Sequence, residues 1–176
     1  MIEIIEGSII DRLKAVIELR KVAYTNSRRD QTFAEAWIGD SYDCRSRHLL
    51  MTDDAGNSIA SVRMIVDGHW PIEDRWSEIL NKDDGVEFGR LCVARHIQAG
   101  KRTIYELMVF ASRLCIELGR PHMYGMTIAP LHTTLVKSGV PLKVLSEPIY
   151  AYGEKQNIVV FDANELVDFY QRRQQS

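Results

Sequence analysis

The sequence predicts an α/β fold with a mixed central sheet flanked by helices. Stretches in which apolar and polar residues alternate, as in strands, are interspersed with stretches in which apolar residues recur every three or four positions, as in helices. Consecutive strand-like stretches near the middle of the chain indicate a meander within that alternation. The expected order of elements is β-α-α-β-β-β-α-β-α-β-β-α. Since the sequence shows no internal repeat, low-complexity tract or linker, we expect residues 1–176 to form a single domain.

Local patterns support each element of the first half of the chain. Apolar residues recur at helical spacing from Ser8 to Tyr24, and a polar turn at 53–57 joins two alternating stretches into a hairpin. The elements expected here are a strand over 1–5, the helix from Ser8, a short helix over 32–38, hairpin strands over 48–52 and 58–66, an irregular region over 67–85, and a strand over 86–94.

The second half begins with the clearest helical pattern. A strong apolar stripe follows Gly100 and ends at Gly119 and Pro121, which are residues that terminate helices. Asp162 and Glu165 resemble a capping box at the start of the last helix. The elements expected here are the helix after Gly100, a strand over 122–128, a short helix over 130–138, strands over 142–145 and 157–161, and a helix to about residue 172.

The composition is that of an ordinary globular domain and excludes several classes of protein. The 22 Lys and Arg residues nearly balance the 24 Asp and Glu residues, so no overall charge attracts the chain to nucleic acid. The sequence shows no run of about 18 apolar residues and no basic, apolar leader, so we expect a cytoplasmic protein without a membrane segment. The cysteines and histidines show no ligand spacing, so we expect neither a disulfide framework nor a metal site.

Two arginines fall where apolar side chains are expected. Arg20 lies on the apolar stripe of the first helix, between Val16 and Tyr24, and Arg63 lies in the middle of a strand. A buried guanidinium without a partner is strongly unfavourable. Each arginine is therefore expected either to form an internal salt bridge or to line a polar pocket.

Glu87, Gly89 and Arg90 lie together in the strand expected at 86–94. In a regular strand Glu87 and Arg90 would point to opposite faces, because their separation along the chain is odd. Glycine inside a strand often marks a bulge, which would bring both charges to one side. We therefore predict a bulge or splay of the sheet at Gly89, with a backbone N–H left available to a ligand.

The charged residues stand in the order Arg20, Asp40-x-x-Asp43, Arg63, Glu87-x-x-Arg90. Over residues 10–145 this ordered set resembles that of the acyl-homoserine-lactone (autoinducer) synthases. It also resembles that of their relatives, the long-chain N-acyl amino acid synthases. Both belong to the GNAT-like acyltransferases, so the resemblance implies a GNAT-like fold and an acyltransferase.

The departures from that set favour the N-acyl amino acid synthases. The lactone synthases usually carry a tryptophan soon after the helix aromatic, here Tyr24, whereas this chain offers Trp37, well downstream. The interval from Arg63 to Glu87 is also shorter than the lactone branch implies. The resemblance therefore implies transfer of a long-chain acyl group from acyl-carrier protein to the amine of an amino acid. The alternatives are a lactone synthase that uses S-adenosylmethionine and a non-catalytic module that binds an acyl chain or a partner.

Acyl transfer from a thioester to an amine requires a base, N–H donors for the oxyanion and aligned reactants. Within the resemblance, Glu87 is the expected base, acting through water, with a plain structural salt bridge as the alternative. The N–H groups near Arg90 and Leu91 are the expected oxyanion donors. Arg20, Arg63 or Arg90 is expected to bind a substrate carboxylate, with an internal Arg90–Asp43 pair as the alternative, in which the aspartates only orient the arginines. The expected substrate-binding residues are Arg20, Asp40, Asp43, Arg63 and Thr127, the last near the acyl carbonyl.

A long acyl chain also requires an apolar channel, and its carrier requires a basic surface. The channel candidates, for which a core position is the alternative, are Met64, Trp76, Met108, Phe110, Met123 and Met126. The carrier and pantetheine candidates, for which a solvated charged face is the alternative, are Arg95, Lys101 and Arg102, with Arg28 and Arg29. No tightly bound cofactor is expected, and the acyl-phosphopantetheine of the acyl-carrier protein is the co-substrate.

Overall fold

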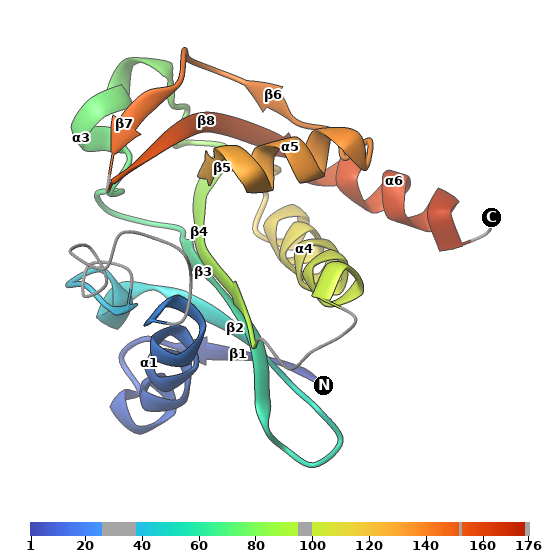
Figure 1. Cartoon of the computed structure of the whole chain (residues 1–176). Helices are drawn as coiled ribbons and strands as arrows, with labels where there is room; N and C mark the ends of the chain where they lie inside the picture. Colours follow the sequence, from blue (N-terminus) through green and yellow to red (C-terminus); the bar gives the residue numbers. More distant parts are fainter. Residues whose placement is uncertain (26–37, 95–99, 152, 175–176) are drawn as a thin grey trace. The chain divides into compact units, whose positions relative to one another are not determined.

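The computed structural model describes residues 1–25, 38–94, 100–151 and 153–174 (Figure 1). The strands of these residues form a mixed sheet in the hydrogen-bonded order β1-β2-β3-β4-β5-β8-β6, with β7 paired to β8, so the expected α/β class is confirmed. The contacts divide the chain into two compact units, Met1–Val66 with Phe88–Leu107 and Asp67–Glu87 with Met108–Ser176. Strand β4 (Gly85–Val93) contributes residues to both units.

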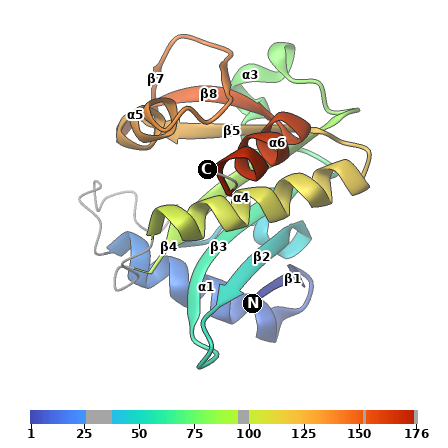
Figure 2. The same ribbon diagram turned by 90° about the vertical axis from the view of Figure 1, so that its right-hand side faces the viewer.

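The first unit is built on antiparallel strands. Strand β2 (Arg47–Thr52) pairs with β1 (Ile2–Glu6) on one side and with β3 (Ser58–Ile65) on the other. Helix α1 (Ile10–Thr25) packs against these three strands, as both ribbon views show (Figures 1 and 2). The 3-10 turn η2 (Asp43–Arg45) leads into β2. The core of this unit includes Val16, Leu49, Val62 and Met64, each fully buried.

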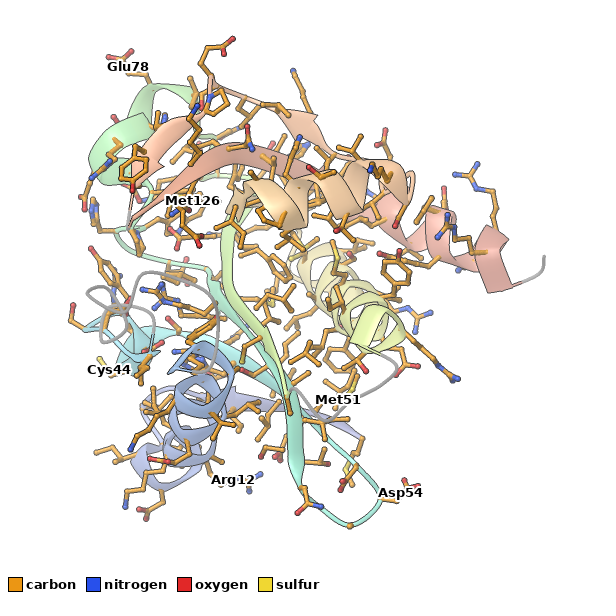
Figure 3. All side chains as sticks on the ribbon, viewed as in Figure 1. Arg12, Cys44, Met51, Asp54, Glu78 and Met126 are labelled. Atoms are coloured by element: carbon orange, nitrogen blue, oxygen red, sulfur yellow. The ribbon has the colours of Figure 1, made fainter. Side chains whose placement is uncertain are left out.

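The hairpin between β2 and β3 is confirmed, and its turn follows from its sequence. The Asp53 carboxylate accepts the backbone N–H of Ala55 (3.0 Å) and of Asn57 (2.8 Å). Gly56 has a φ of 85°, which a residue without Cβ adopts at little cost. Asp54 lies at the tip of the loop (Figure 3).

The second unit is built around β5 (His122–Ile128). Its beginning is parallel to the first part of β4, with Glu87 opposite Tyr124, and its whole length is antiparallel to β8 (Glu154–Asp162). Helix α5 packs against β5 and β8, and helix α6 packs against β8. The remaining elements with residues in this unit are α3 (Glu73–Trp76), the 3-10 turn η3 (Ser77–Ile79), α4 (Gly100–Glu117), α5 (Ala129–Lys137), β6 (Lys143–Val144), β7 (Ile149–Ala151) and α6 (Ala163–Gln174).

Some elements differ from the sequence-based expectation. The region expected to be irregular, 67–85, contains α3 and η3, and strand β7 was not expected. Strand β8 begins at Glu154 instead of residue 157, because its polar first residues pair with β7 and β5 although they lack an alternating pattern. The helix expected over 32–38 lies almost entirely outside the described residues. In the described parts of the chain, no helix is both long and apolar enough to cross a membrane.

Candidate functional site

The first unit holds a buried cluster of three arginines and two aspartates. From α1, Arg20 donates through Nη1 to Asp43 Oδ1 at 2.8 Å. From β3, Arg63 donates through Nη1 to Asp40 Oδ1 at 2.6 Å and to Asp43 Oδ1 at 3.2 Å. From β4, Arg90 places Nη2 at 2.7 Å from Asp40 Oδ2. Arg20 and Arg63 therefore form internal salt bridges, the first of the two expected alternatives. Arg90 pairs with Asp40 instead of Asp43, because Asp43 is already engaged by Arg20 and Arg63.

The two aspartates meet because the segment 40–43 forms a tight turn. The backbone N–H of Asp43 donates to the Asp40 carbonyl (3.1 Å), and the backbone N–H of Asp40 donates to the Asp43 carboxylate (3.0 Å). The chain after β1 passes very close to this turn, since a Cβ built on Gly7 would lie 1.8 Å from the Asp43 carbonyl oxygen. Only glycine permits that approach. The Gly7 N–H also donates to the Ser46 carbonyl at 2.7 Å, which fixes the turn beside β1.

His48 completes the cluster. From the sequence, the histidines were assessed only as possible metal ligands, so this role of His48 was not predicted. Its side chain is fully buried on β2, with Nδ1 3.0 Å from Arg20 Nη2 and Nε2 3.0 Å from the Asp43 carbonyl oxygen. An arginine can only donate and a carbonyl can only accept, so Nδ1 is the acceptor and Nε2–H the donor of a neutral imidazole. Burial, with the Arg20 charge, lowers the pKa of His48 from 6.5 to about 4, although the Asp43 carbonyl opposes the shift. His48 is therefore neutral at physiological pH.

Both aspartates are ionised at neutral pH. Burial alone would raise the pKa of Asp40, but Arg63 and Arg90 outweigh it and hold that pKa below its ordinary 3.8. Burial likewise opposes ionisation of Asp43, and Arg20 and Arg63 lower the pKa of that carboxyl in the same way. The cluster is therefore a network of fully charged, mostly buried ion pairs, in which removal of one partner leaves the others uncompensated.

On β4, Glu87 is a buried carboxylate in the second unit. Glu87 is only 4% exposed, and its Oε2 accepts a hydrogen bond from the backbone N–H of Ile72 at 3.0 Å. Ile72 is itself 1% exposed, so the hydrogen bond is shielded from water. An N–H directed at a carboxylate favours its ionised form, which is the form that can accept a proton.

The backbone of β4 departs from regular strand geometry one residue after Gly89, the position where the sequence predicts a bulge or splay. Arg90 has a φ of 56°, a left-handed conformation that side-chain-bearing residues rarely adopt inside a strand. The carbonyl of Leu91, the next residue, accepts the hydroxyl of Tyr24 at 3.1 Å. The Tyr24 side chain thus provides a hydrogen-bond donor for the Leu91 carbonyl of β4. This role of Tyr24 could not be predicted from the sequence, in which its position on the helical stripe was the only available signal.

The remaining predicted site residues lie in β5, α4 and the core. Thr127 is 5% exposed on β5, and its hydroxyl has no hydrogen-bond partner within the described residues. Three channel candidates, Met64, Met108 and Met123, are fully buried core residues, which is the stated alternative for them. The channel candidates that remain partly accessible are Trp76, Phe110 and Met126.

Most of the expected basic patch lies outside the described residues. Arg28, Arg29 and Arg95 fall in undescribed segments, as does Trp37, and the side chain of Lys101 is not described. Arg102 lies in the first turn of α4, is exposed and pairs with Glu106 at 2.8 Å.

Solved structures match the chain by fold, whereas no protein-family model and no curated protein matches its sequence. The CoA-dependent acyl-homoserine lactone synthase BjaI, solved with SAM and isopentyl-CoA, matches with a TM-score of 0.79 at 17% identity, over 98% of this chain and 88% of BjaI. The AHL synthase LasI matches with a TM-score of 0.73 at 14% identity, over 93% of this chain and 90% of LasI.

A further match lies outside the lactone synthases. An acyl-CoA N-acyltransferase from Pseudomonas aeruginosa matches with a TM-score of 0.66 at 16% identity, over 91% of this chain and 97% of that enzyme. At these identities the likeness establishes the fold. The chain therefore has the GNAT-like acyltransferase fold that the sequence predicts.

Proposed function

We propose that this chain is an N-acyltransferase that moves an acyl group from a thioester to the α-amino group of an amino acid. One observation carries the proposal. In a chain with an acyltransferase fold, strand β4 bears a buried carboxylate, Glu87, three residues before the left-handed backbone position at Arg90. A carboxylate can accept the amine proton, and backbone N–H groups at a strand irregularity can bind an oxyanion.

The proposed reaction has two steps, attack of the amine on the thioester and departure of the thiol. The uncharged α-amine attacks the thioester carbonyl carbon and forms the C–N bond, while a proton passes from nitrogen through water to Glu87. The carbonyl oxygen becomes an oxyanion, which accepts hydrogen bonds from the N–H groups near Arg90 and Leu91. The C–S bond then breaks, the carbonyl re-forms, and the departing thiolate takes the proton from Glu87. The products are an N-acyl amino acid and a free thiol.

For the substrate carboxylate we propose Arg90 as the direct contact. Its side chain is 11% exposed, whereas those of Arg20 and Arg63 are 0% and 3% exposed. Arginine presents a planar fork that matches a carboxylate. Arg20 and Arg63 then act indirectly, since they fix the aspartates of the cluster. The proposed acyl contacts are Thr127 and the partly accessible residues Trp76, Phe110 and Met126.

Two acceptors that share an α-amino acid group are candidates. The downstream position of Trp37 favours a free amino acid, which is the first proposal. The likeness to BjaI, solved with SAM, and to TofI, solved with an inhibitor and MTA, supports S-adenosylmethionine as the second. After acylation of that acceptor, a carboxylate oxygen would displace sulfur, forming a C–O bond, breaking a C–S bond and releasing methylthioadenosine with the lactone.

The donor proposed is a long-chain acyl-carrier protein. BjaI and MesI are described as CoA-dependent, so acyl-CoA is the competing donor. Both donors present the acyl group as a thioester of phosphopantetheine. The reaction at β4 is therefore the same for either, and only the surface that receives the carrier differs.

The decisive experiment offers both donors and both acceptors to the purified protein. Products are identified by mass spectrometry, with either a panel of amino acids or S-adenosylmethionine present. We expect an N-acyl amino acid from acyl-carrier protein and no consumption of S-adenosylmethionine. Lactone with methylthioadenosine, and no acylated amino acid, would establish the second candidate. Donor binding without any acyl product would indicate the non-catalytic module instead.

A matched pair of variants tests the assignment of the base. Glu87→Gln keeps the size of the side chain and removes its ability to accept a proton, so turnover should fall about 100-fold or more. Glu117→Gln makes the same change at an exposed position of α4 and should leave turnover unaltered. If Glu87→Gln retains full activity while both variants keep the wild-type urea midpoint, Glu87 is not the base.

A further inference from the structure

The segment 68–82, which connects β3 to β4 in the second unit, is closed upon itself by Lys82. The ammonium group of Lys82 donates to the Gly68 carbonyl at 2.6 Å and lies 2.6 Å from Glu73 Oε1. One side chain therefore joins the two ends of the segment and its middle. Its ammonium also lies 5.4 Å from the centre of the Trp70 ring, within reach of a cation–π interaction.

Glu73 is the centre of this closure. Its Oε1 accepts the backbone N–H of Trp70 at 2.6 Å, and its Oε2 lies 3.3 Å from His69 Nδ1. Burial opposes ionisation of this carboxyl, but the Lys82 ammonium and the Trp70 N–H hold the pKa of Glu73 below its ordinary 4.5. The carboxylate is therefore charged at neutral pH, and the Lys82–Glu73 pair is a true ion pair. We call Lys82 and Glu73 the latch of the segment.

The closed segment contacts Glu87, the carboxylate that the proposed mechanism uses as base. Trp70 and Ile72 are 0% and 1% exposed, so this part of the segment is anchored in the core of the unit. Between Trp70 and Glu73, the backbone N–H of Ile72 donates to Glu87 Oε2 at 3.0 Å. The latch thus fixes the peptide group that holds Glu87.

We infer that Lys82 and Glu73 are positioning residues for Glu87, acting through the backbone N–H of Ile72. This inference rests on the proposed function insofar as Glu87 is the base. With the latch closed, the N–H holds the carboxylate in one orientation and favours its ionised form over the neutral one. With the latch open, the hydrogen bond is lost, and the carboxylate is less ionised at a given pH and less well aligned with the amine. Misalignment by about an ångström is enough to lower a catalytic rate substantially.

The variant Lys82→Met tests the latch, because methionine keeps much of the aliphatic stem and removes the charge. Lys137→Met, on an exposed face of α5, is the matched control. Hydrogen exchange of peptides that cover 68–82, followed by mass spectrometry, should be faster in Lys82→Met and unchanged in Lys137→Met. The urea midpoint should be nearly the same in both, since an ion pair with a partly exposed ammonium contributes little to global stability.

The pH dependence of kcat/KM provides the readout that a purely structural latch would not change. In Lys82→Met the acid limb of the profile should move to higher pH, with about tenfold lower kcat/KM on that limb and partial recovery on the plateau. Glu73→Gln should reproduce the shift. In the background of Glu87→Gln, Lys82→Met should have no further effect on the pH profile.

The outcomes separate this inference from the proposed function. Faster exchange together with a displaced acid limb supports the latch. A wild-type profile in Lys82→Met, with Glu87→Gln inactive, overturns the latch and leaves the proposed function standing. Full activity of Glu87→Gln overturns the proposed function, and with it any positioning role. Unchanged exchange in Lys82→Met shows that Lys82 does not hold the segment closed, whatever the activity.

Discussion

Replacing Asp43 with asparagine should destabilise the fold far more than loss of an ordinary surface charge. The Asp43 carboxylate receives Arg20 at 2.8 Å and Arg63 at 3.2 Å, with side-chain exposures of 4%, 0% and 3% for the three groups. The same residue offers its carbonyl to His48 at 3.0 Å. Asparagine preserves the size of the side chain and removes the negative charge that two buried guanidinium groups share.

The size of the effect follows from that burial. Breaking a buried ion pair by removing one partner typically costs about 3–5 kcal/mol, because the remaining charge stays desolvated. The asparagine oxygen can still accept one hydrogen bond, so we expect the lower end, about 3 kcal/mol in the free energy of unfolding. For a chain of this length, that loss corresponds to a fall in Tm of roughly 6–12 °C.

Urea unfolding at pH 7, followed by far-UV circular dichroism, measures the loss directly. The control is Asp11→Asn on α1, where the carboxylate is 91% exposed and pairs with Lys14 three residues along the helix. That pair should contribute less than about 0.5 kcal/mol. An Asp43→Asn protein within about 1 kcal/mol of the wild type would refute the view that the cluster is a tightly coupled, charged network.

Two further predictions concern His48 and Tyr24. Burial lowers the pKa of His48 from 6.5 to about 4, so between pH 4 and pH 6.5 the unfolded chain binds more protons than the folded chain. The stability contributed by neutral His48 is therefore complete above pH 6.5 and is lost as the pH falls towards 4. The loss amounts to about 3 kcal/mol, and a urea midpoint that stays constant from pH 7 to 4.5 would contradict it. Tyr24→Phe removes the hydroxyl bonded to Leu91 and should cost about 1 kcal/mol and lower kcat with little change in KM. Tyr150→Phe, which removes an exposed hydroxyl bonded to the Gly153 carbonyl at 2.7 Å, is the control, and identical behaviour of the two variants would exclude a special role for Tyr24.

The sequence predicts that the buried arginines need charged partners, but it does not predict which residue pairs with which arginine. Arg20 on an apolar helical stripe and Arg63 in mid-strand each required a counter-charge on local grounds alone. Pairing to the aspartates was a stated alternative, but which arginine meets which aspartate depends on the turn at 40–43 lying beside both α1 and β3, which no local pattern encodes. His48 escaped notice for the same reason. Its role is defined by two atoms contributed from α1 and from the turn, both distant in the sequence.

The irregular backbone of β4 shows how closely local sequence can locate a deviation from regular strand geometry. Glycine marks positions where the backbone is free to deviate, so Gly89 gave the correct neighbourhood. The residue that actually adopts the left-handed conformation is Arg90, with a φ of 56°, against its intrinsic preference. The energy that compensates such a preference comes from tertiary contacts. A reading of local sequence therefore locates the deviation only to within a residue.

Those tertiary contacts connect the charged cluster with the proposed chemistry. A left-handed arginine costs about 1–2 kcal/mol, which is less than the cost of breaking one buried ion pair. The Arg90 guanidinium is held by Asp40, and Asp40 is held in turn by Arg63 and by the turn that contains Asp43. One peptide further along the strand, the Tyr24 hydroxyl donates to the Leu91 carbonyl. The Arg90–Leu91 peptide lies between the fixed Arg90 side chain and the fixed Leu91 carbonyl, and it therefore has few alternative orientations. Donors that are fixed before the reaction need no reorganisation when the oxyanion forms, and preorganised donors of this kind are the most effective in acyl transfer. The buried ion pairs would then contribute to catalysis through the backbone that they hold in place.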